Sequence, residues 1–275
     1  MAVLTRVASR SVPAPEITFV RFLVGLAGAG AYWLVRRDAF RSHAWGLLVL
    51  RGVLGGAAVL LYFVAIERCG AGVGSLLNYM HPVFAAIFAS MFLGERLSRT
   101  FAIGLALATV GVTMVLGGFT IFLGESAVPW GVGHLAGAAS AVLGGGAVTT
   151  IRAARATESS ASIFGSFCIA GAFISAGPAL THWTAPDVRG WALLVSVGVL
   201  GLGAQVVMTY AFKFITAGAG AAVSQLVPVL AFVLSWVFLD ERLTPTAVVG
   251  AFLVVVGMVF AQRGEPEAAL ETTDA

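Results

Sequence analysis

The sequence predicts an all-α polytopic membrane protein made of two five-helix repeats of inverted topology, with the first helix missing and about nine transmembrane helices in total. Three observations predict this fold: the composition, a succession of apolar runs and an internal repeat. The chain is 59% hydrophobic and 11% charged, with a mean hydropathy of +0.96, whereas roughly a quarter of the residues in soluble proteins are charged. A soluble core could not hide this much apolar surface, so we expect lipid to be the solvent.

Apolar runs of about 17 to 25 residues, long enough to cross a bilayer as a helix, follow one another along the chain. The nine predicted spans are Ile17–Val35, Trp45–Ile66, Ala71–Leu93, Phe101–Ile121, Val132–Ile151, Ile163–Thr181, Trp191–Phe212, Ala217–Leu239 and Ala247–Ala261. The linkers between them are too short for a water-soluble domain. We expect the polar tail, residues 264–275, to be disordered in the cytoplasm.

The stretch Ala71–Leu97 recurs as Ala217–Leu243 without a gap, so Pro82 corresponds to Pro228, which lies 146 positions later. Other matches at this spacing are Trp45 with Trp191, Gly52 with Gly198, Gly55 with Gly201, Glu95 with Glu241, Gly104 with Gly250 and Gly111 with Gly257. The repeat predicts a first half at residues 1–123 and a second half at residues 128–263. The partner of the span Val132–Ile151 would then lie upstream of Met1, so either one helix is lacking or the start is placed too late.

Repeats of five helices begin on alternate sides of the membrane, so the two halves must be inverted relative to one another. On this scheme the inner side carries Arg36, Arg37, Arg41, Arg96, Arg99, Arg152, Arg155, Lys213 and Arg263, and the opposite side carries Arg6, Arg10, Arg68, Arg189 and Arg242. Basic residues favour the cytoplasmic side. We therefore expect a multi-pass protein of the inner (cytoplasmic) membrane with its C-terminus in the cytoplasm.

Each copy of the repeated stretch carries a proline in the middle of its span. Proline frees the carbonyl four residues before it, here those of Asn78 and Ser224. In lipid an unpaired carbonyl is tolerated where helices pack or where a cavity holds water, and interrupted spans at matched positions of two halves indicate a central binding site. We therefore interpret Pro82 and Pro228 as helix kinks beside such a site.

Polar side chains inside the spans are the candidates for substrate contact. Asn78 and His81 lie beside the first proline, and Ser224 and Gln225 lie beside the second. The alternative is that they bond across helices and only stabilise packing. Further candidates are Tyr62, Gln205 and Tyr210, which are polar in one half of the repeat only, so we expect a chemically asymmetric cavity.

Arg21 and Arg51 lie a turn or two inside their spans. We favour an interpretation in which both extend to the lipid headgroups, and keep substrate binding by Arg51 as the alternative, which would favour an anionic or carboxylated substrate. The acidic residues lie at span edges, so His81 is the one central side chain that titrates near neutral pH. We hypothesise that it couples transport to protons.

A series of short motifs runs along the first half: Arg21, Arg51-Gly52, Pro82, Leu93-Gly94-Glu95-Arg96-Leu97, Gly104 and Gly111. Those from Pro82 onward recur in the same order as Pro228, Leu239-Asp240-Glu241-Arg242-Leu243, Gly250 and Gly257. In these motifs the sequence resembles the EamA-type members of the drug/metabolite transporter superfamily. The resemblance implies ten spans in two inverted repeats and export or exchange of small metabolites or drugs by alternating access. The first helix of that plan, which helps line the family's cavity, is the one lacking here.

We therefore expect a secondary transporter whose partners are a small-molecule substrate, the lipid bilayer and, as an option, a second copy in a homodimer. The net charge of +3 is explained by membrane orientation, so no nucleic acid is expected. A non-transporting membrane protein, either a truncated paralogue or a partner subunit, stays as the alternative. An intramembrane enzyme is disfavoured because no nucleophile–base pair or metal motif is present, and neither a cofactor nor a metal is expected.

Overall fold

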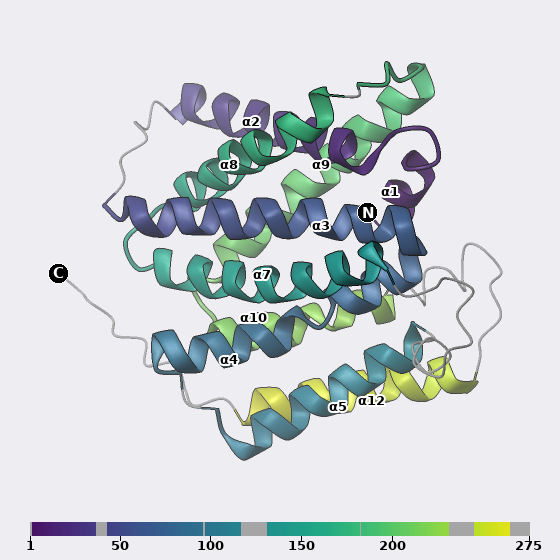
Figure 1. The fold of residues 1–275 in the computed structure, drawn as a ribbon. Helices are drawn as coiled ribbons and strands as arrows, with labels where there is room; N and C mark the ends of the chain where they lie inside the picture. The colour runs from purple at the N-terminus through teal and green to yellow at the C-terminus, as the bar shows by residue number, and fades with distance from the viewer. Residues whose placement is uncertain are drawn as a thin grey trace.

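The computed structural model describes residues 2–36, 43–95, 97–116, 131–181, 183–230 and 245–264, and these form helices without any strand (Figure 1). The helices are α1 (Ala2–Ala8), α2 (Ala14–Arg36), α3 (Trp45–Asn78), α4 (His81–Leu93), α5 (Arg99–Val115), α7 (Val132–Ala154), α8 (Ser160–Leu180), α9 (Val188–Ala211), α10 (Ala217–Ser224) and α12 (Pro245–Arg263). Residues 226–230 are also helical. The all-helical fold class is therefore confirmed.

Six helical stretches within the described residues are long and apolar enough to cross a membrane. They are Ala14–Leu34, Trp45–Leu93, Val132–Ala154, Ser160–Leu180, Val188–Ala211 and Pro245–Arg263. The shorter apolar stretches Arg99–Val115 and Ala217–Leu230 lie where two further spans are predicted. The number nine stays a prediction. Arg37, Arg41, Arg96, residues 239–243 and the tail beyond Gly264 lie outside the described residues.

The stretch Trp45–Leu93 is interrupted at two places. Gly70 adopts a φ of +86° inside α3, a left-handed conformation that glycine reaches without a Cβ clash. A second turn at Tyr79 and Met80 separates α3 from α4. Figure 1 shows the chain turning back within α3 and running through the last part of α3 into α4. The stretch that contains the predicted spans Trp45–Ile66 and Ala71–Leu93 is therefore not one continuous straight helix; that the two are separate crossings stays a prediction.

Four helices begin at a side chain that caps the first turn. Ser98, Ser159, Asp187 and Thr216 each accept a hydrogen bond from the backbone N–H three residues further on. Such a cap satisfies one of the donors that a helix start leaves unpaired. The capping residues therefore fix where α5, α8, α9 and α10 begin.

Helices from the two halves of the chain pack in pairs. α2 packs on α8, and α5 packs on α12. At the second pair, a Cβ added to Gly111 would lie 2.5 Å from the carbonyl oxygen of Gly250, and one added to Gly257 would lie 2.5 Å from that of Gly104. Small residues let helix backbones approach closely in a membrane, so these glycines explain the tight α5–α12 contact.

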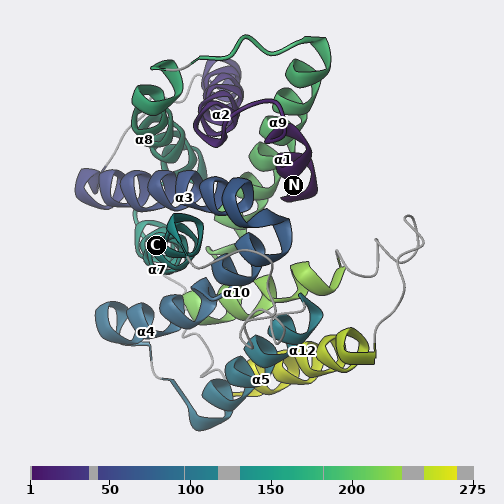
Figure 2. The same ribbon diagram turned by 45° about the vertical axis from the view of Figure 1, so that its right-hand side comes forward.

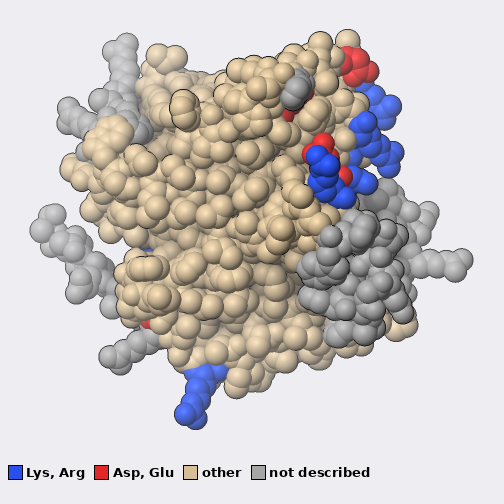
Figure 3. Space-filling model, viewed as in Figure 1, with Lys and Arg blue, Asp and Glu red and all other residues tan. Residues whose placement is uncertain are grey.

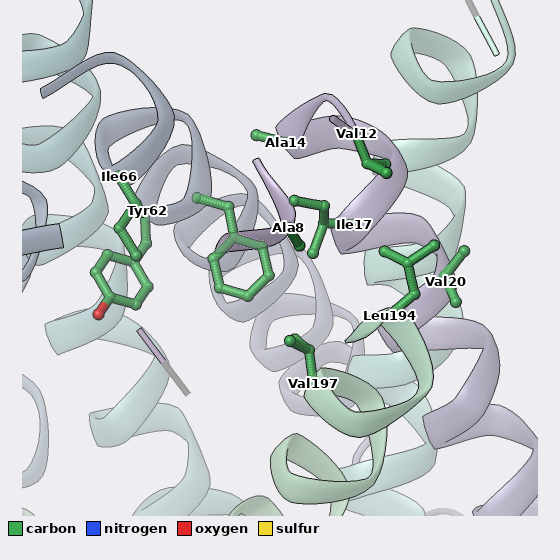
Figure 4. Packing of buried hydrophobic residues seen from close by; sticks show 10 residues of the cluster. Ala8, Val12, Ala14, Ile17, Val20, Tyr62, Ile66, Leu194 and Val197 are labelled. Carbon is green, nitrogen blue, oxygen red and sulfur yellow. The ribbon is translucent and has the colours of Figure 1, made fainter. Parts of the chain in front are cut away.

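One layer of helices lies on each side of α3 and α7. Figure 2 shows α1, α2, α8 and α9 on one side, and α4, α5, α10 and α12 on the other. A cluster of buried apolar side chains holds the first layer together; Figure 4 shows Ile17 and Val20 of α2, Ile66 of α3, and Leu194 and Val197 of α9. The face in Figure 3 is almost free of charged side chains across its middle, as expected for a surface in contact with lipid.

Candidate functional site

The turn between α3 and α4 places His81 directly before Pro82. The Nδ1 atom of His81 lies 2.9 Å from the carbonyl oxygen of Asn78, which is the carbonyl that Pro82 leaves without its helical donor. A carbonyl only accepts, so Nδ1 carries a proton and donates. The side chain of His81, next to the proline, therefore satisfies the carbonyl that the proline leaves without a donor. Both Pro82 and Pro228 are buried.

The other nitrogen of His81 reaches the second copy of the repeat. Its Nε2 lies 3.4 Å from Ser224 Oγ, and Ser224 corresponds to Asn78 at the repeat spacing. Since Nδ1 donates to Asn78, Nε2 of a neutral imidazole accepts from the Ser224 hydroxyl, whereas Nε2 of a protonated imidazole would donate to it. The two kinked segments thus face one another and touch through a group that can change charge.

Asn78 and Gln225 bond to residues on neighbouring helices. Asn78 Nδ2 donates to Ser140 Oγ at 3.0 Å, and Gln225 Nε2 donates to Thr109 Oγ1 at 3.3 Å. Gln225 is 0% exposed, and its Oε1 has no hydrogen-bond partner among the described residues. Ser140 and Thr109 were not among the predicted site residues, although each is a polar residue inside a predicted span.

Arg51 bonds to Gln205 at 3.1 Å between Nη2 and Oε1. It is 2% exposed and Arg21 is 5% exposed, so the prediction that both extend to the headgroups is wrong. The physical reason is the direction of the side chains: both point between helices, where the aromatic rings of Phe63 and Phe167 cover the guanidinium groups. Two of the predicted candidates, Arg51 and Gln205, therefore lie together in the interior.

Tyr62 is 8% exposed, and its hydroxyl lies 3.0 Å from Ser75 Oγ. Figure 4 shows this hydroxyl pointing away from the apolar cluster that its ring joins. Since Ser75 lies on the segment of α3 beyond Gly70, the bond ties the two parts of the broken helix together.

Tyr210 lies apart from the other candidates. It is 58% exposed and lines a groove of about 1180 Å³ between α2, α8 and α9, together with Tyr32, Arg155 and Lys213. Five positions along a helix turn the side chain by about 140°, which explains why Tyr210 faces this groove while Gln205 faces the interior. Burial lowers the pKa of Arg155, the residue that follows α7. The predicted site residues thus fall into an interior group and a groove.

The described residues contain no group of three or more His, Cys, Asp or Glu side chains that could hold a metal ion. Cys69 and Cys168 are both buried free thiols. The buried polar residues that the structure describes include Gln225, several hydroxyl residues, His134, the carboxylates Glu16 and Glu158, and the guanidiniums of Arg21 and Arg51.

Comparisons with known proteins agree with one another. The model of the EamA-like transporter family matches residues 1–117 and 131–262. The pseudopaline exporter CntI of Pseudomonas aeruginosa is 29% identical over 96% of this chain and 91% of its own length. A protein of Streptantibioticus cattleyicolor named "Probable terminal-alkyne amino-acid exporter" is 30% identical over 87% of this chain and 80% of its own length. A solved crystal structure superimposes with a TM-score of 0.78 at 23% identity, covering 95% of this chain and 91% of the other.

Proposed function

Because the chain belongs to the EamA-like transporter family, we propose that it is a secondary transporter that exports small metabolites or drugs by alternating access between two inverted repeats. Two relatives are named as exporters, one of pseudopaline and one of a terminal-alkyne amino acid. Exporters move a solute across a membrane without changing it. The names support a transporter of small organic solutes rather than an enzyme.

The inverted repeat is supported by one contact that both halves make. Arg6 Nη1 donates to the carbonyl oxygen of Ile66 at 3.3 Å, and Arg152 Nη1 donates to that of Phe212 at 3.2 Å. Arg152 corresponds to Arg6 and Phe212 corresponds to Ile66 at the repeat spacing. We take residues 1–123 and 128–263 as the two halves, and α1 as the counterpart of the last turns of α7.

The observation that carries the proposed function is the contact of His81 with Ser224 across the two kinked segments. In transporters with inverted repeats the substrate site lies where the interrupted helices of the two halves meet. We propose that Asn78, His81, Ser224 and Gln225 contact substrate when this contact opens. In the conformation described here these side chains bond to one another and to neighbouring helices, so the site is closed.

The carboxylate of Glu95, just after α4, contacts the start of α10. Glu95 Oε1 accepts from the backbone N–H of Ala217 at 3.2 Å and lies 4.0 Å from Arg152 Nε. A carboxylate at a helix N-terminus is stabilised by the unpaired donors and the helix dipole. We propose that this contact is the inner gate. This gate would lie on the cytoplasmic side of the membrane, where the C-terminus would also lie.

The membrane would be the cytoplasmic (inner) membrane, and the further partners would be the substrate and, in a homodimer, a second copy. The test has two steps. A thermal-shift screen of the purified chain against amino acids, nucleosides and cationic drugs identifies a ligand, because a ligand that binds only the folded state raises its stability. Proteoliposomes then report whether that ligand is moved. A ligand that stabilises the protein but crosses no faster than in protein-free liposomes would contradict transport.

A further inference from the structure

Two guanidinium groups lie inside the helical bundle with no carboxylate beside them. Arg51 on α3 is 2% exposed and Arg21 on α2 is 5% exposed. Among the described residues, neither forms an ion pair, and Arg51 Nε and Arg21 Nη1 have no hydrogen-bond partner. A buried charge without a counter-charge is costly, and ionisable residues within a membrane are usually functional. An anion between the two guanidiniums would offset this cost.

Aromatic rings surround the two guanidiniums without neutralising them. The Arg51 guanidinium lies 4.1 Å from the centroid of the Phe167 ring, and that of Arg21 lies 5.5 Å from the centroid of Phe63. Cation–π contacts hold a guanidinium in place and leave its N–H edge available for an acceptor. Aromatic rings next to a pair of cations suit a ligand that has an apolar part beside its anionic group.

The two arginines lie where the halves of the repeat meet. A Cβ added to Gly201 would lie 2.6 Å from Arg21 Nε, and one added to Gly55 would lie 2.9 Å from the ring of Phe167. Gly201 corresponds to Gly55, and Phe167 corresponds to Arg21. The same close contact is thus made in both halves, with an arginine in one and a phenylalanine in the other. Inverted-repeat transporters bind their substrates at the interface between the repeats, and the two arginines also lie at this interface.

The groove between α2, α8 and α9 leads toward this pair. Its lining includes Phe164 and Leu202, and both pack in one cluster with Phe22 and Phe167, the rings that contact the two guanidiniums. Lys213 and Arg155 line the same groove and give it a positive charge. A ligand in the groove would therefore contact Phe164 and Leu202, which pack in the same cluster as the rings beside the arginines.

We propose that Arg21 and Arg51 together bind the carboxylate of the substrate, so that the protein selects small molecules with a carboxylate beside an apolar group. Two arginines suit this role because a guanidinium binds a carboxylate through two parallel hydrogen bonds. The proposal rests on the proposed transport function, since the pair is buried in the closed conformation and alternating access would expose it.

The test compares two probes of nearly equal size, N-acetyl-L-phenylalanine and N-acetyl-L-phenylalaninamide, which differ in the carboxylate. In a thermal-shift titration of the full-length protein in detergent, we expect the acid to bind at least about tenfold more tightly than the amide, since hydrogen bonds to charged groups are the stronger ones. Arg51→Gln and Arg21→Gln should each abolish that preference. Arg189→Gln, which removes the same charge from an exposed position on α9, should keep it.

Equal binding of acid and amide by the wild-type protein would overturn the proposal, as would an acid preference that survives both glutamine substitutions. Stabilisation by inorganic phosphate but not by the acid would also overturn it. Should the glutamine variants fail to fold, Arg51→Lys keeps the charge but loses the planar fork, and it should weaken binding of the acid relative to wild type. Flux of the amide in proteoliposomes without any preference for the acid would leave transport intact and remove this site. Binding of the acid that depends on the two arginines, without flux in proteoliposomes, would support this site and contradict the proposed transport.

Discussion

His81 and Ser224, which belong to opposite copies of the internal repeat, meet at 3.4 Å between Nε2 and Oγ. The carbonyl of Asn78, the residue that corresponds to Ser224, bonds to the other nitrogen of the same imidazole. One side chain therefore contacts equivalent positions of both copies. Separation of the two kinked segments must break the bond to Ser224, whereas the bond to Asn78 lies within one segment and can persist.

His81→Gln should remove the pH dependence of transport. Histidine changes charge between about pH 5 and 8, and protonation turns Nε2 from an acceptor of the Ser224 hydroxyl into a donor. Glutamine can bond to Ser224 but does not titrate. The measurement is flux in proteoliposomes over this pH range. Ser224→Ala serves as the control, because it keeps the imidazole and should keep the pH profile. An unchanged pH profile in His81→Gln would contradict proton coupling through His81.

Gly257→Ala should lower the stability of the protein by about 1 to 3 kcal/mol, the usual cost of overpacking. The added Cβ would lie 2.5 Å from the backbone nitrogen of Ala108 on the partner helix α5. Gly30→Ala is the matched control, since its Cβ would meet no atom of the described residues within 4 Å. Thermal unfolding in detergent measures both. Equal midpoints for the two variants would show that α5 and α12 do not pack this closely.

Glu95→Ala should loosen the start of α10. The carboxylate accepts from the Ala217 N–H and pairs with Arg152, and a cap of this kind is worth about 1 kcal/mol. Hydrogen exchange at residues 217–219 should therefore quicken about fivefold in nanodiscs. Asp187→Ala, which removes the cap of α9 instead, should leave α10 unchanged. Identical exchange at α10 in wild type and Glu95→Ala would show that the carboxylate does not hold this end.

The two ends of α9 should label from opposite sides of the membrane. Arg189 lies near its start and Lys213 just after its end, and both are exposed. Single cysteines at these positions can be introduced after the buried Cys69 and Cys168 are replaced by alanine. An impermeant maleimide should label Lys213→Cys only in inside-out vesicles and Arg189→Cys only in right-side-out ones. The opposite pattern would reverse the proposed orientation.

The sequence was sufficient to predict features that depend on order along the chain. The repeat spacing pairs Arg6 with Arg152, and both arginines donate to corresponding carbonyls in the structure. The prolines predict a freed carbonyl at Asn78, which His81 satisfies. These features follow from local chemistry and from duplication, so they can be found without knowing how the helices pack.

Features that depend on the rotation of each helix could not be predicted. Hydropathy places Arg21 and Arg51 near span ends, but it does not tell whether the side chains point to the headgroups or between helices, and the structure buries both. Tyr210 and Gln205 share a helix, yet only Gln205 faces the interior. The break at Gly70 is also a tertiary feature, because a glycine in an apolar run can equally well continue a helix.

Labelling of Ser224→Cys from each side of the membrane tests alternating access most directly. In the background lacking Cys69 and Cys168, separate samples of inside-out and right-side-out vesicles are treated with a small impermeant thiol reagent. If the contact between His81 and Ser224 opens in turn to either side, the cysteine reacts slowly in both preparations. Reaction in only one preparation, or in neither while the Lys213→Cys control reacts normally, would contradict a site that alternates between the two sides.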